Sequence, residues 1–199
     1  MFVNTAEGTC GLVLAGGKSR RMGQDKALLR HNGETQLGLA VRLLQQHLAR
    51  VFVSARADQS TEPERARFSQ IVDRYANLGP LAGILSAMDT DPQAAWLVVA
   101  CDLPNLDSET IRHLLDERSA TQPFTAYRSS VDGMPEPLCA IYNPSARRIL
   151  DEFVAAGVQC PRKIMMRSDT RQLEARNPRA LDNINTPDEL SQHAAGLAS

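Results

Sequence analysis

Short runs of consecutive apolar residues alternate along this chain with stretches in which apolar positions recur every three or four residues. The runs predict buried strands, and the helical spacing predicts amphipathic helices. In the first half of the chain, the pattern predicts strands at residues 10–14, 50–54, 71–73 and 96–101, and helices at residues 36–47, 81–88 and 109–117. Ser108 is the expected N-cap of the last of these helices.

The order of these elements predicts an α/β fold. A strand, a helix and a second strand in succession favour a parallel sheet with right-handed crossovers. The second half is less regular, with strands predicted at 124–127 and 138–142 around the turn-rich segment 132–137, and a helix at 145–155. Such an insertion is able to supply a lid or a pocket for a second substrate.

A glycine-rich, basic segment follows the first predicted strand. Gly16 and Gly17 carry no Cβ, so the backbone is able to turn sharply and bring its N–H groups close to an anion. With Gly23, they fit neither the Walker A spacing nor the dinucleotide-binding fingerprint, and a glycine pair after a strand is also an ordinary tight turn. The cations of the segment suit a triphosphate. They are Lys18, Arg20, Arg21 and Lys26.

A single carboxylate follows the predicted strand at residues 96–101. In an open α/β sheet, ligands gather at the carboxyl ends of the strands, where Asp102 should emerge. Mg²⁺ is a hard cation that takes one or two carboxylates together with substrate phosphate oxygens. Taken alone, Asp102 before Pro104 is more typical of a turn residue. Beside the basic segment, the pattern favours Asp102 as a metal ligand, with Mg²⁺ as the expected cofactor.

Several motifs together resemble those of the molybdenum cofactor guanylyltransferases. Residues 14–26 read L-A-G-G-x-S-x-R-M-G-x-D-K, and residues 101–104 read C-D-x-P. Residues 79–84 match a G-P-L-x-G-I loop, and residues 136–142 resemble an E-P-L-x-A-L-Y strand. Residues 183–190 are similar to a closing N-x-N-T-P-E-E-L. The matches follow the family order and cover nearly the whole chain.

This resemblance implies a single Rossmann-like, three-layer α/β/α nucleotidyltransferase domain with a mostly parallel central sheet. It would span residues 1–199, with a nucleotide-binding half at about 8–105 and an acceptor-binding half at about 106–191. The implied reaction transfers GMP from GTP to the phosphate of molybdopterin, releasing pyrophosphate and forming the guanine dinucleotide cofactor. The alternatives are a molybdopterin cytidylyltransferase, a cobinamide-phosphate or sugar-phosphate nucleotidyltransferase, and a noncatalytic nucleotide-binding scaffold.

The resemblance also implies roles for individual residues. Because the incoming phosphate is already a nucleophile, the site needs alignment and charge neutralisation more than acid–base groups. Asp102 would hold Mg²⁺, and Lys26 and Arg21 would bind the triphosphate, which makes these three the expected catalytic residues. Gly16 and Gly17 would offer backbone contacts. The family's nucleotide contacts correspond to Leu14, Ala15, Gly16, Lys26, Asp73 and Asp102.

Asp73 is the candidate for base recognition. A carboxylate is able to accept two hydrogen bonds from the N1–H and amino edge of guanine, donors that adenine does not present together. Its alternative role is a polar strand end. At the nearby nucleotide-site position, Ser54 stands where relatives often carry Asn, and water or Arg56 could replace the longer side chain.

The acceptor side rests on the closing motif. The resemblance implies that Asn183 and Asn185 face molybdopterin, since an amide both donates and accepts. The same motif is also an ordinary helix start with Thr186 as N-cap, and both roles can coexist. A second basic cluster would either bind the acceptor phosphate or form a solvated face. It comprises Arg162, Lys163 and Arg167.

Composition fits a compact enzyme and excludes other classes. With 199 residues, 43% of them hydrophobic, and a net charge of −1, the chain supports one core and has no general attraction to nucleic acid or membrane. It lacks a signal-peptide pattern and a long apolar segment, so we expect a cytoplasmic protein. The expected partners are GTP and molybdopterin, with transient contacts to molybdoenzymes or cofactor-handling proteins.

The cysteines and histidines indicate neither a disulfide framework nor a metal site. No C-x-x-C pair occurs, and three of the cysteines are expected in or beside buried strands. The histidines show no ligand spacing and are assigned to surface or core packing. The residues concerned are Cys10, Cys101, Cys139 and Cys160, and His31, His47, His113 and His193.

Overall fold

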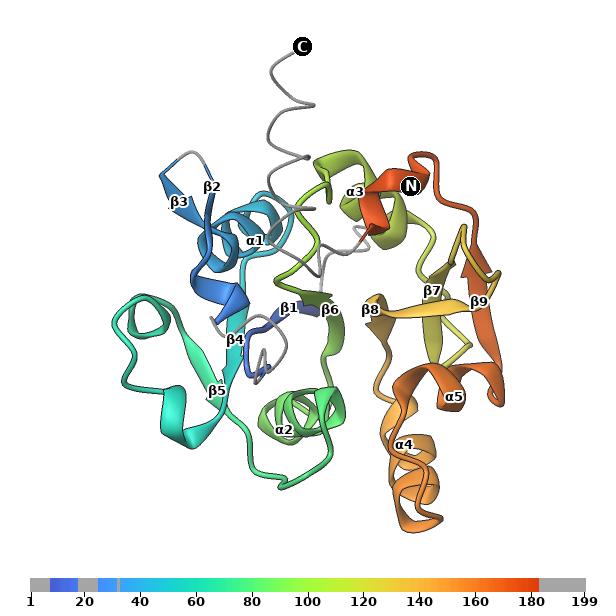
Figure 1. Cartoon of the computed structure of the whole chain (residues 1–199). Helices are drawn as coiled ribbons and strands as arrows, with labels where there is room; N and C mark the ends of the chain where they lie inside the picture. Colours follow the sequence, from blue (N-terminus) through green and yellow to red (C-terminus); the bar gives the residue numbers. More distant parts are fainter. Residues whose placement is uncertain (1–7, 18–24, 32, 183–199) are drawn as a thin grey trace.

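A seven-stranded sheet forms the middle layer of the protein, in the order β5-β4-β1-β6-β8-β7-β9 (Figure 1). This computed structural model describes residues 8–17, 25–31 and 33–182. The strands of the sheet are β1 (Thr9–Leu14), β4 (Val51–Ala55), β5 (Gln70–Val72), β6 (Ala95–Ala100), β7 (Phe124–Arg128), β8 (Pro135–Tyr142) and β9 (Thr170–Leu173). A separate hairpin pairs β2 (Arg30–His31) with β3 (Glu34–Thr35).

Helices cover both faces of the sheet, which confirms the predicted three-layer α/β/α architecture. They are α1 (Gln36–Gln45), α2 (Pro80–Thr90), α3 (Ser108–Asp116), α4 (Ala146–Ala155) and α5 (Pro161–Met166). The described chain also forms short 3₁₀ helices, η1 (Lys26–Leu28), η2 (Ala57–Gln59), η3 (Arg65–Arg67) and η4 (Pro178–Leu181). Within the described part of the chain, none of the helices combines the length and apolar character needed to span a membrane.

The sheet is mostly parallel, as predicted. β1 pairs in parallel with β4 and β6, β4 with β5, and β7 with β9. β8 alone of the seven runs against its neighbours, because it pairs antiparallel with both β6 and β7. The amino end of β8 therefore lies beside the carboxyl end of β6.

Some details of the secondary structure differ from the sequence prediction. The helix α3 is capped by Asp107, not Ser108, because the Asp107 Oδ1 accepts a 2.7 Å hydrogen bond from the Thr110 N–H. Ser108 is the first helical residue, and its Oγ lies 2.8 Å from His47 Nε2. The short elements α5 and β9 were not predicted. For β9 the reason is that it is a polar edge strand without an apolar run.

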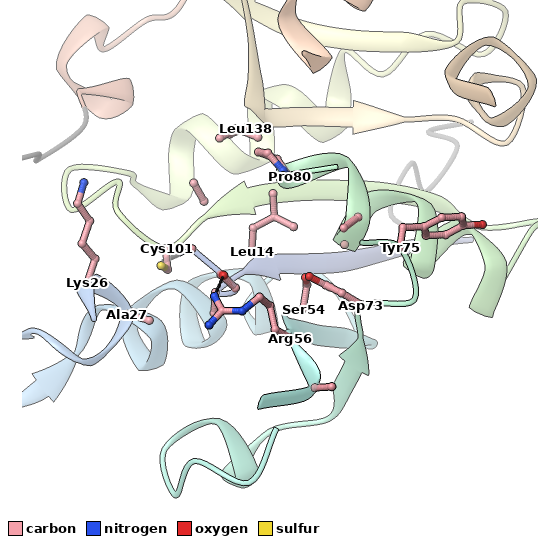
Figure 2. A pocket seen from close by; sticks show the side chains of 18 of the residues that line it. Leu14, Lys26, Ala27, Ser54, Arg56, Asp73, Tyr75, Pro80, Cys101 and Leu138 are labelled. Carbon is pink, nitrogen blue, oxygen red and sulfur yellow. Dashed lines mark hydrogen bonds between the residues drawn. The ribbon is translucent and has the colours of Figure 1, made fainter. Parts of the chain in front are cut away.

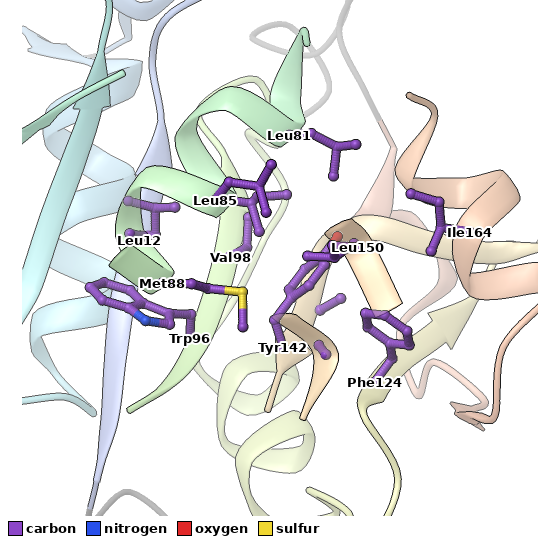
Figure 3. Close-up of a cluster of buried hydrophobic side chains, with 14 of the residues drawn as sticks. Leu12, Leu81, Leu85, Met88, Trp96, Val98, Phe124, Tyr142, Leu150 and Ile164 are labelled. Carbon is purple, nitrogen blue, oxygen red and sulfur yellow. The ribbon is translucent and has the colours of Figure 1, made fainter. Parts of the chain in front are cut away.

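The core consists of two apolar clusters, one on each face of the sheet. On one face, Leu85 and Met88 of α2 pack near Trp96 of β6, while Leu150 of α4 lies near Tyr142 of β8 (Figure 3). On the other face, the apolar sides of α1 and α3 pack against the same strands. Full burial of such side chains supplies the main driving force for this layered fold.

The cysteines lie where the sequence placed them. Cys10 and Cys139 are buried in β1 and β8, and Cys101 follows β6. Cys160 is exposed, and all four are free thiols. The described residues contain no group of three or more His, Cys, Asp or Glu side chains arranged to hold a metal ion.

Gly83 allows α2 to pack closely against the ends of β1 and β4. A Cβ on Gly83 would lie 2.2 Å from Ser54 Oγ and 2.9 Å from Leu14 Cδ2. Such distances are far shorter than a van der Waals contact, so any larger residue would push the helix off the sheet.

We expect Gly83→Ala to lower the free energy of unfolding by about 1–3 kcal/mol through overpacking. The sign is informative, because helix propensity alone would make alanine more stable by about 1 kcal/mol. Urea unfolding measures the change. The double variant Gly83→Ala/Ser54→Gly should recover part of the loss, since it removes the nearest contacting atoms. A Gly83→Ala variant as stable as the natural protein would contradict this packing.

Candidate active site

A cleft of about 770 Å³ opens at the carboxyl ends of β1, β4, β5 and β6 (Figure 2). The chain passes from β1 to β4 and β5 on one side and then returns to β6 on the other side of β1. This reversal is a topological switch point, the place where open α/β sheets bind ligands. The cleft therefore lies where the strand order alone would put a binding site.

The end of β1 forms one wall of the cleft. Leu14, Ala15, Gly16 and Gly17 all line it. A Cβ on Gly16 would lie 3.3 Å from Asp73 Oδ2, so a side chain at this position would crowd that carboxylate. The glycine thus keeps the backbone close to the neighbouring strand ends and open toward the cleft.

Lys26 and Asp102 meet across the cleft although 76 positions separate them in the sequence. The Lys26 Nζ donates to Asp102 Oδ2 at 3.2 Å, and the two side chains are 18% and 24% exposed. Lys26 begins η1, whose N-cap is Asp25, and Asp102 follows β6. The structure therefore brings together a cation and a carboxylate that sequence analysis assigned to one site, and leaves both reachable from solvent.

Ser54 and Asp73 lie side by side at the ends of β4 and β5 (Figure 2). The Ser54 hydroxyl donates a 2.7 Å hydrogen bond to Asp73 Oδ1. Burial raises the pKa of the Asp73 carboxyl above its usual value, and the Ser54 hydrogen bond and the Arg56 charge offset part of that shift. Asp73 is thus a partly desolvated carboxylate with a single described hydrogen-bond donor on Oδ1 and its Oδ2 toward Gly16.

Two arginines that sequence analysis did not place in the site contact the end of β1. Arg56 donates to the Gly16 carbonyl at 2.5 Å and forms a two-bond pair with Asp58. Arg65 is fully buried and donates to the Ala15 carbonyl at 2.7 Å. Sequence analysis considered Arg56 only as a substitute near Ser54. No pattern distinguished Arg65 from the other charged residues of its turn-rich segment.

The nucleophilic and basic side chains of the described chain contribute little proton chemistry to the cleft. Burial raises the pKa of the Cys101 thiol to about 12, so the thiol stays protonated near neutral pH. Neither His47 nor His113 lines the cleft.

A second cavity of about 710 Å³ adjoins the first and shares Pro80 and Leu138 with it. Arg162 lines this cavity and is paired with two carboxylates, donating to Asp132 Oδ2 at 3.0 Å and to Glu136 Oε2 at 2.8 Å. Lys163 and Arg167 of the same basic cluster are exposed. Three further predicted site residues, Arg21, Asn183 and Asn185, lie outside the described residues.

Residues 11–173 match the protein family described as the MobA-like NTP transferase domain. The chain belongs to this family. Its match includes the ends of β1, β4, β5 and β6, so the cleft is built from family segments. The predicted family resemblance is therefore confirmed.

Individual relatives agree with this MobA-like assignment. The chain is 36% identical to a molybdenum cofactor biosynthesis bifunctional protein of Synechocystis over 92% of its own length, and spans about half (52%) of that protein. It is 31% identical to a molybdenum cofactor guanylyltransferase of Shewanella sp. strain MR-4, covering 94% of this chain and 95% of that one.

A solved structure shares the fold of this MobA-like chain. The molybdopterin-guanine dinucleotide biosynthesis protein A of Archaeoglobus fulgidus superposes with a TM-score of 0.76 at 22% identity. The superposition covers 96% of this chain and 99% of that one. The superposition thus extends over nearly the whole layered arrangement of this chain.

Proposed function

We propose that this protein transfers GMP from GTP to the terminal phosphate of molybdopterin, releasing pyrophosphate and forming the guanine dinucleotide cofactor. The observation that carries the proposal is the Lys26–Asp102 pair beside the glycine-rich end of β1. A cation and a metal-binding carboxylate at that edge suit a nucleoside triphosphate. The name of the Shewanella relative, a molybdenum cofactor guanylyltransferase, supports guanylyl transfer to the cofactor.

The chemistry asks the protein for alignment and charge neutralisation. An oxygen of the acceptor phosphate forms a new bond to the α-phosphorus of GTP, and the bond from that phosphorus to the β-phosphate bridging oxygen breaks. Both reactants are anions, so their repulsion opposes the approach. Lys26 reduces this repulsion by binding the triphosphate, and the backbone at Gly16 and Gly17 holds it in place.

Asp102 fits the expected role of a Mg²⁺ ligand. Mg²⁺ is commonly held by one or two carboxylates, with substrate phosphates completing its octahedron, so no cluster of protein ligands is required. Asp102 is 24% exposed and lines the cleft, which leaves an oxygen accessible to a cation brought in with the nucleotide. Bound there, Mg²⁺ would neutralise charge on the α-phosphoryl group.

Asp73 is proposed to recognise the base. Its Oδ1 already accepts from Ser54, and each carboxylate oxygen is able to accept more than one hydrogen bond. The carboxylate thus retains acceptor capacity for the N1–H and amino group of guanine. The Ser54 side chain also packs closely against α2, since a Cβ on Gly83 would lie 2.2 Å from Ser54 Oγ.

The second cavity is the proposed site of molybdopterin. It opens beside the nucleotide cleft, with Pro80 and Leu138 on the boundary, so an acceptor there would lie next to the triphosphate. Arg162 would offer its guanidinium to the acceptor phosphate in exchange for carboxylate contacts. The roles of Asn183 and Asn185 toward molybdopterin, and of Arg21 toward the triphosphate, remain predictions from the family motifs. Transient contacts with molybdoenzymes or cofactor-handling proteins would follow product formation.

The first test is pyrophosphate release from GTP, CTP, ATP and UTP in parallel, with molybdopterin as acceptor and with or without Mg²⁺. We expect release with GTP alone, and only when Mg²⁺ is present. Release with CTP would assign the chain to cytidylyl transfer. A protein that binds GTP but releases no pyrophosphate with molybdopterin would be a scaffold or would use a different acceptor.

Substitution of the central pair should separate binding from turnover. We expect Asp102→Ala to reduce turnover at least about a hundredfold with a modest loss of nucleotide affinity. The carboxylate would hold the Mg²⁺ that neutralises charge on the reacting phosphoryl group. Lys26→Ala should weaken both. Steady-state kinetics and direct GTP titration measure the two effects, and Asp102→Asn serves as the isosteric control. Turnover of Asp102→Ala at the natural rate would refute the metal-ligand role.

The role of Asp73 predicts a pH-dependent nucleotide preference. Guanine binds the ionised carboxylate, and the pKa of Asp73 is raised in the free protein. The ratio of GTP to ATP affinity should therefore fall as the pH decreases through the raised pKa of Asp73. This fall should occur at a higher pH than the ordinary pKa of an aspartate would give. The ratio cancels the titration of the phosphates, which both nucleotides share. In Asp73→Ala the ratio should be low at every pH; an unchanged ratio would mean that another group reads the base.

A further inference from the structure

Arg65 occupies a position that the proposed reaction does not explain. Its side chain is fully buried, although arginine is rarely buried without partners. One nitrogen, Nη2, donates to the Ala15 carbonyl and to Asp25 Oδ2, each at 2.7 Å. The other, Nη1, donates to Glu62 Oε2 at 3.2 Å. The guanidinium therefore connects three segments at the base of the nucleotide cleft.

Two of these contacts lie on either side of the glycine-rich segment. Ala15 comes immediately before Gly16, and Asp25 comes immediately before Lys26. Because a single nitrogen binds both, the two ends of the segment are held at a fixed separation. The distance between the backbone at Gly16 and the ammonium of Lys26 depends on this separation.

Asp25 connects Arg65 to the short helix that begins at Lys26. Its Oδ2 accepts from Arg65, and its Oδ1 accepts from the Ala27 N–H at 3.1 Å as the N-cap of η1. Lys26 is the first residue of η1, and its Nζ reaches Asp102. A continuous series of contacts thus runs from buried Arg65 to the pair that carries the proposed function.

The chemistry of the side chain supports a positioning role. Arginine presents several donors in a planar, rigid fork, whereas a lysine ammonium is a single point on a flexible stem. Arg65 uses that fork toward a carbonyl and two carboxylates at once. A group that served only to fill the core would be more stable as an apolar residue, because burying charge costs solvation.

We propose that Arg65 is a positioning residue of the nucleotide site: by holding Ala15 and Asp25 on one guanidinium, it sets the location of Lys26 against the triphosphate. The proposal rests on the proposed function, since it assigns Lys26 to the nucleotide. It predicts that removing the fork harms nucleotide binding through Lys26 and not through general loss of structure.

A double-mutant cycle on nucleotide affinity tests this. Titration calorimetry would compare Arg65→Lys, Lys26→Ala and the double variant with the natural protein. The ligand is whichever of GTP, CTP, ATP and UTP the natural protein binds most tightly, with Mg²⁺. We expect Arg65→Lys to weaken affinity about tenfold in the natural background and at most about twofold in the Lys26→Ala background, because both changes remove one interaction.

The matched control is Arg67→Lys on the same 3₁₀ helix. The Arg67 side chain is 66% exposed and pairs with Glu64 on the surface, so its replacement should leave nucleotide affinity unchanged. Thermal unfolding of every variant, with titration of the binding-competent fraction, separates lost affinity from lost folded protein. An equal loss from Arg65→Lys in both backgrounds, or no loss in either, would overturn the positioning role.

Asp25→Asn provides a second variant should Arg65→Lys not fold. Asparagine is still able to cap η1, but it removes the charge that Arg65 binds. We expect a several-fold loss of affinity that again shrinks in the Lys26→Ala background. Because the readout is binding, the cycle remains decisive if another nucleotide or acceptor replaces those of the proposed function. Failure of the proposed function appears separately, as absent pyrophosphate release.

Discussion

The parallel pairing of β1 with both β4 and β6 is the constraint on which the site depends. It sets Leu14 opposite Ser54 on one side and opposite Ala100 on the other, so three strands end at one level. Segments distant in sequence therefore converge without long loops. The reversed strand β8 has its amino end at the same edge, since Val99 of β6 lies opposite Cys139. Because of this reversal, Leu138 lies at the boundary between the cleft and the second cavity.

The cations around this edge form ion pairs with carboxylates, and the cations differ in their exposure to solvent. Two sets of ion pairs are partly exposed: Lys26 with Asp102, and Arg162 with Asp132 and Glu136. An anionic ligand is able to replace the carboxylates in these pairs, and a metal cation is able to replace the lysine or arginine. Arg65 differs from these cations because its own side chain is fully buried, although its partners Asp25 and Glu62 are each 26% exposed. The exposed pairs keep the free protein from carrying unbalanced charge in the cleft, while the buried arginine fixes the backbone that positions them.

Most of the fold was predictable because the central strands are nearly continuous apolar runs and the helices between them have clear periodicity. Leu14, Gly16, Lys26, Asp73 and Asp102 were found through motifs, and the structure places them around one cleft. Local pattern did not reveal β9, which is polar at a sheet edge, or the role of Asp107, since Asp107 and Ser108 are both good caps. The sequence did not indicate a role for Arg65, because its partners include the Ala15 carbonyl and the Asp25 carboxylate, which are far away in sequence. Only the folded chain brings them within hydrogen-bonding distance.

The proposed reaction joins two phosphates, which would make alignment the main task of the protein. Such catalysis is sensitive to small displacements, because bringing reacting groups into line supplies much of the rate enhancement. The side chains that touch no substrate then matter as much as those that do. Gly83 admits α2 close to Ser54, and Arg65 fixes the interval between Ala15 and Asp25. Function in this fold is therefore distributed between a few accessible charges at the strand ends and the buried contacts that determine where those charges lie.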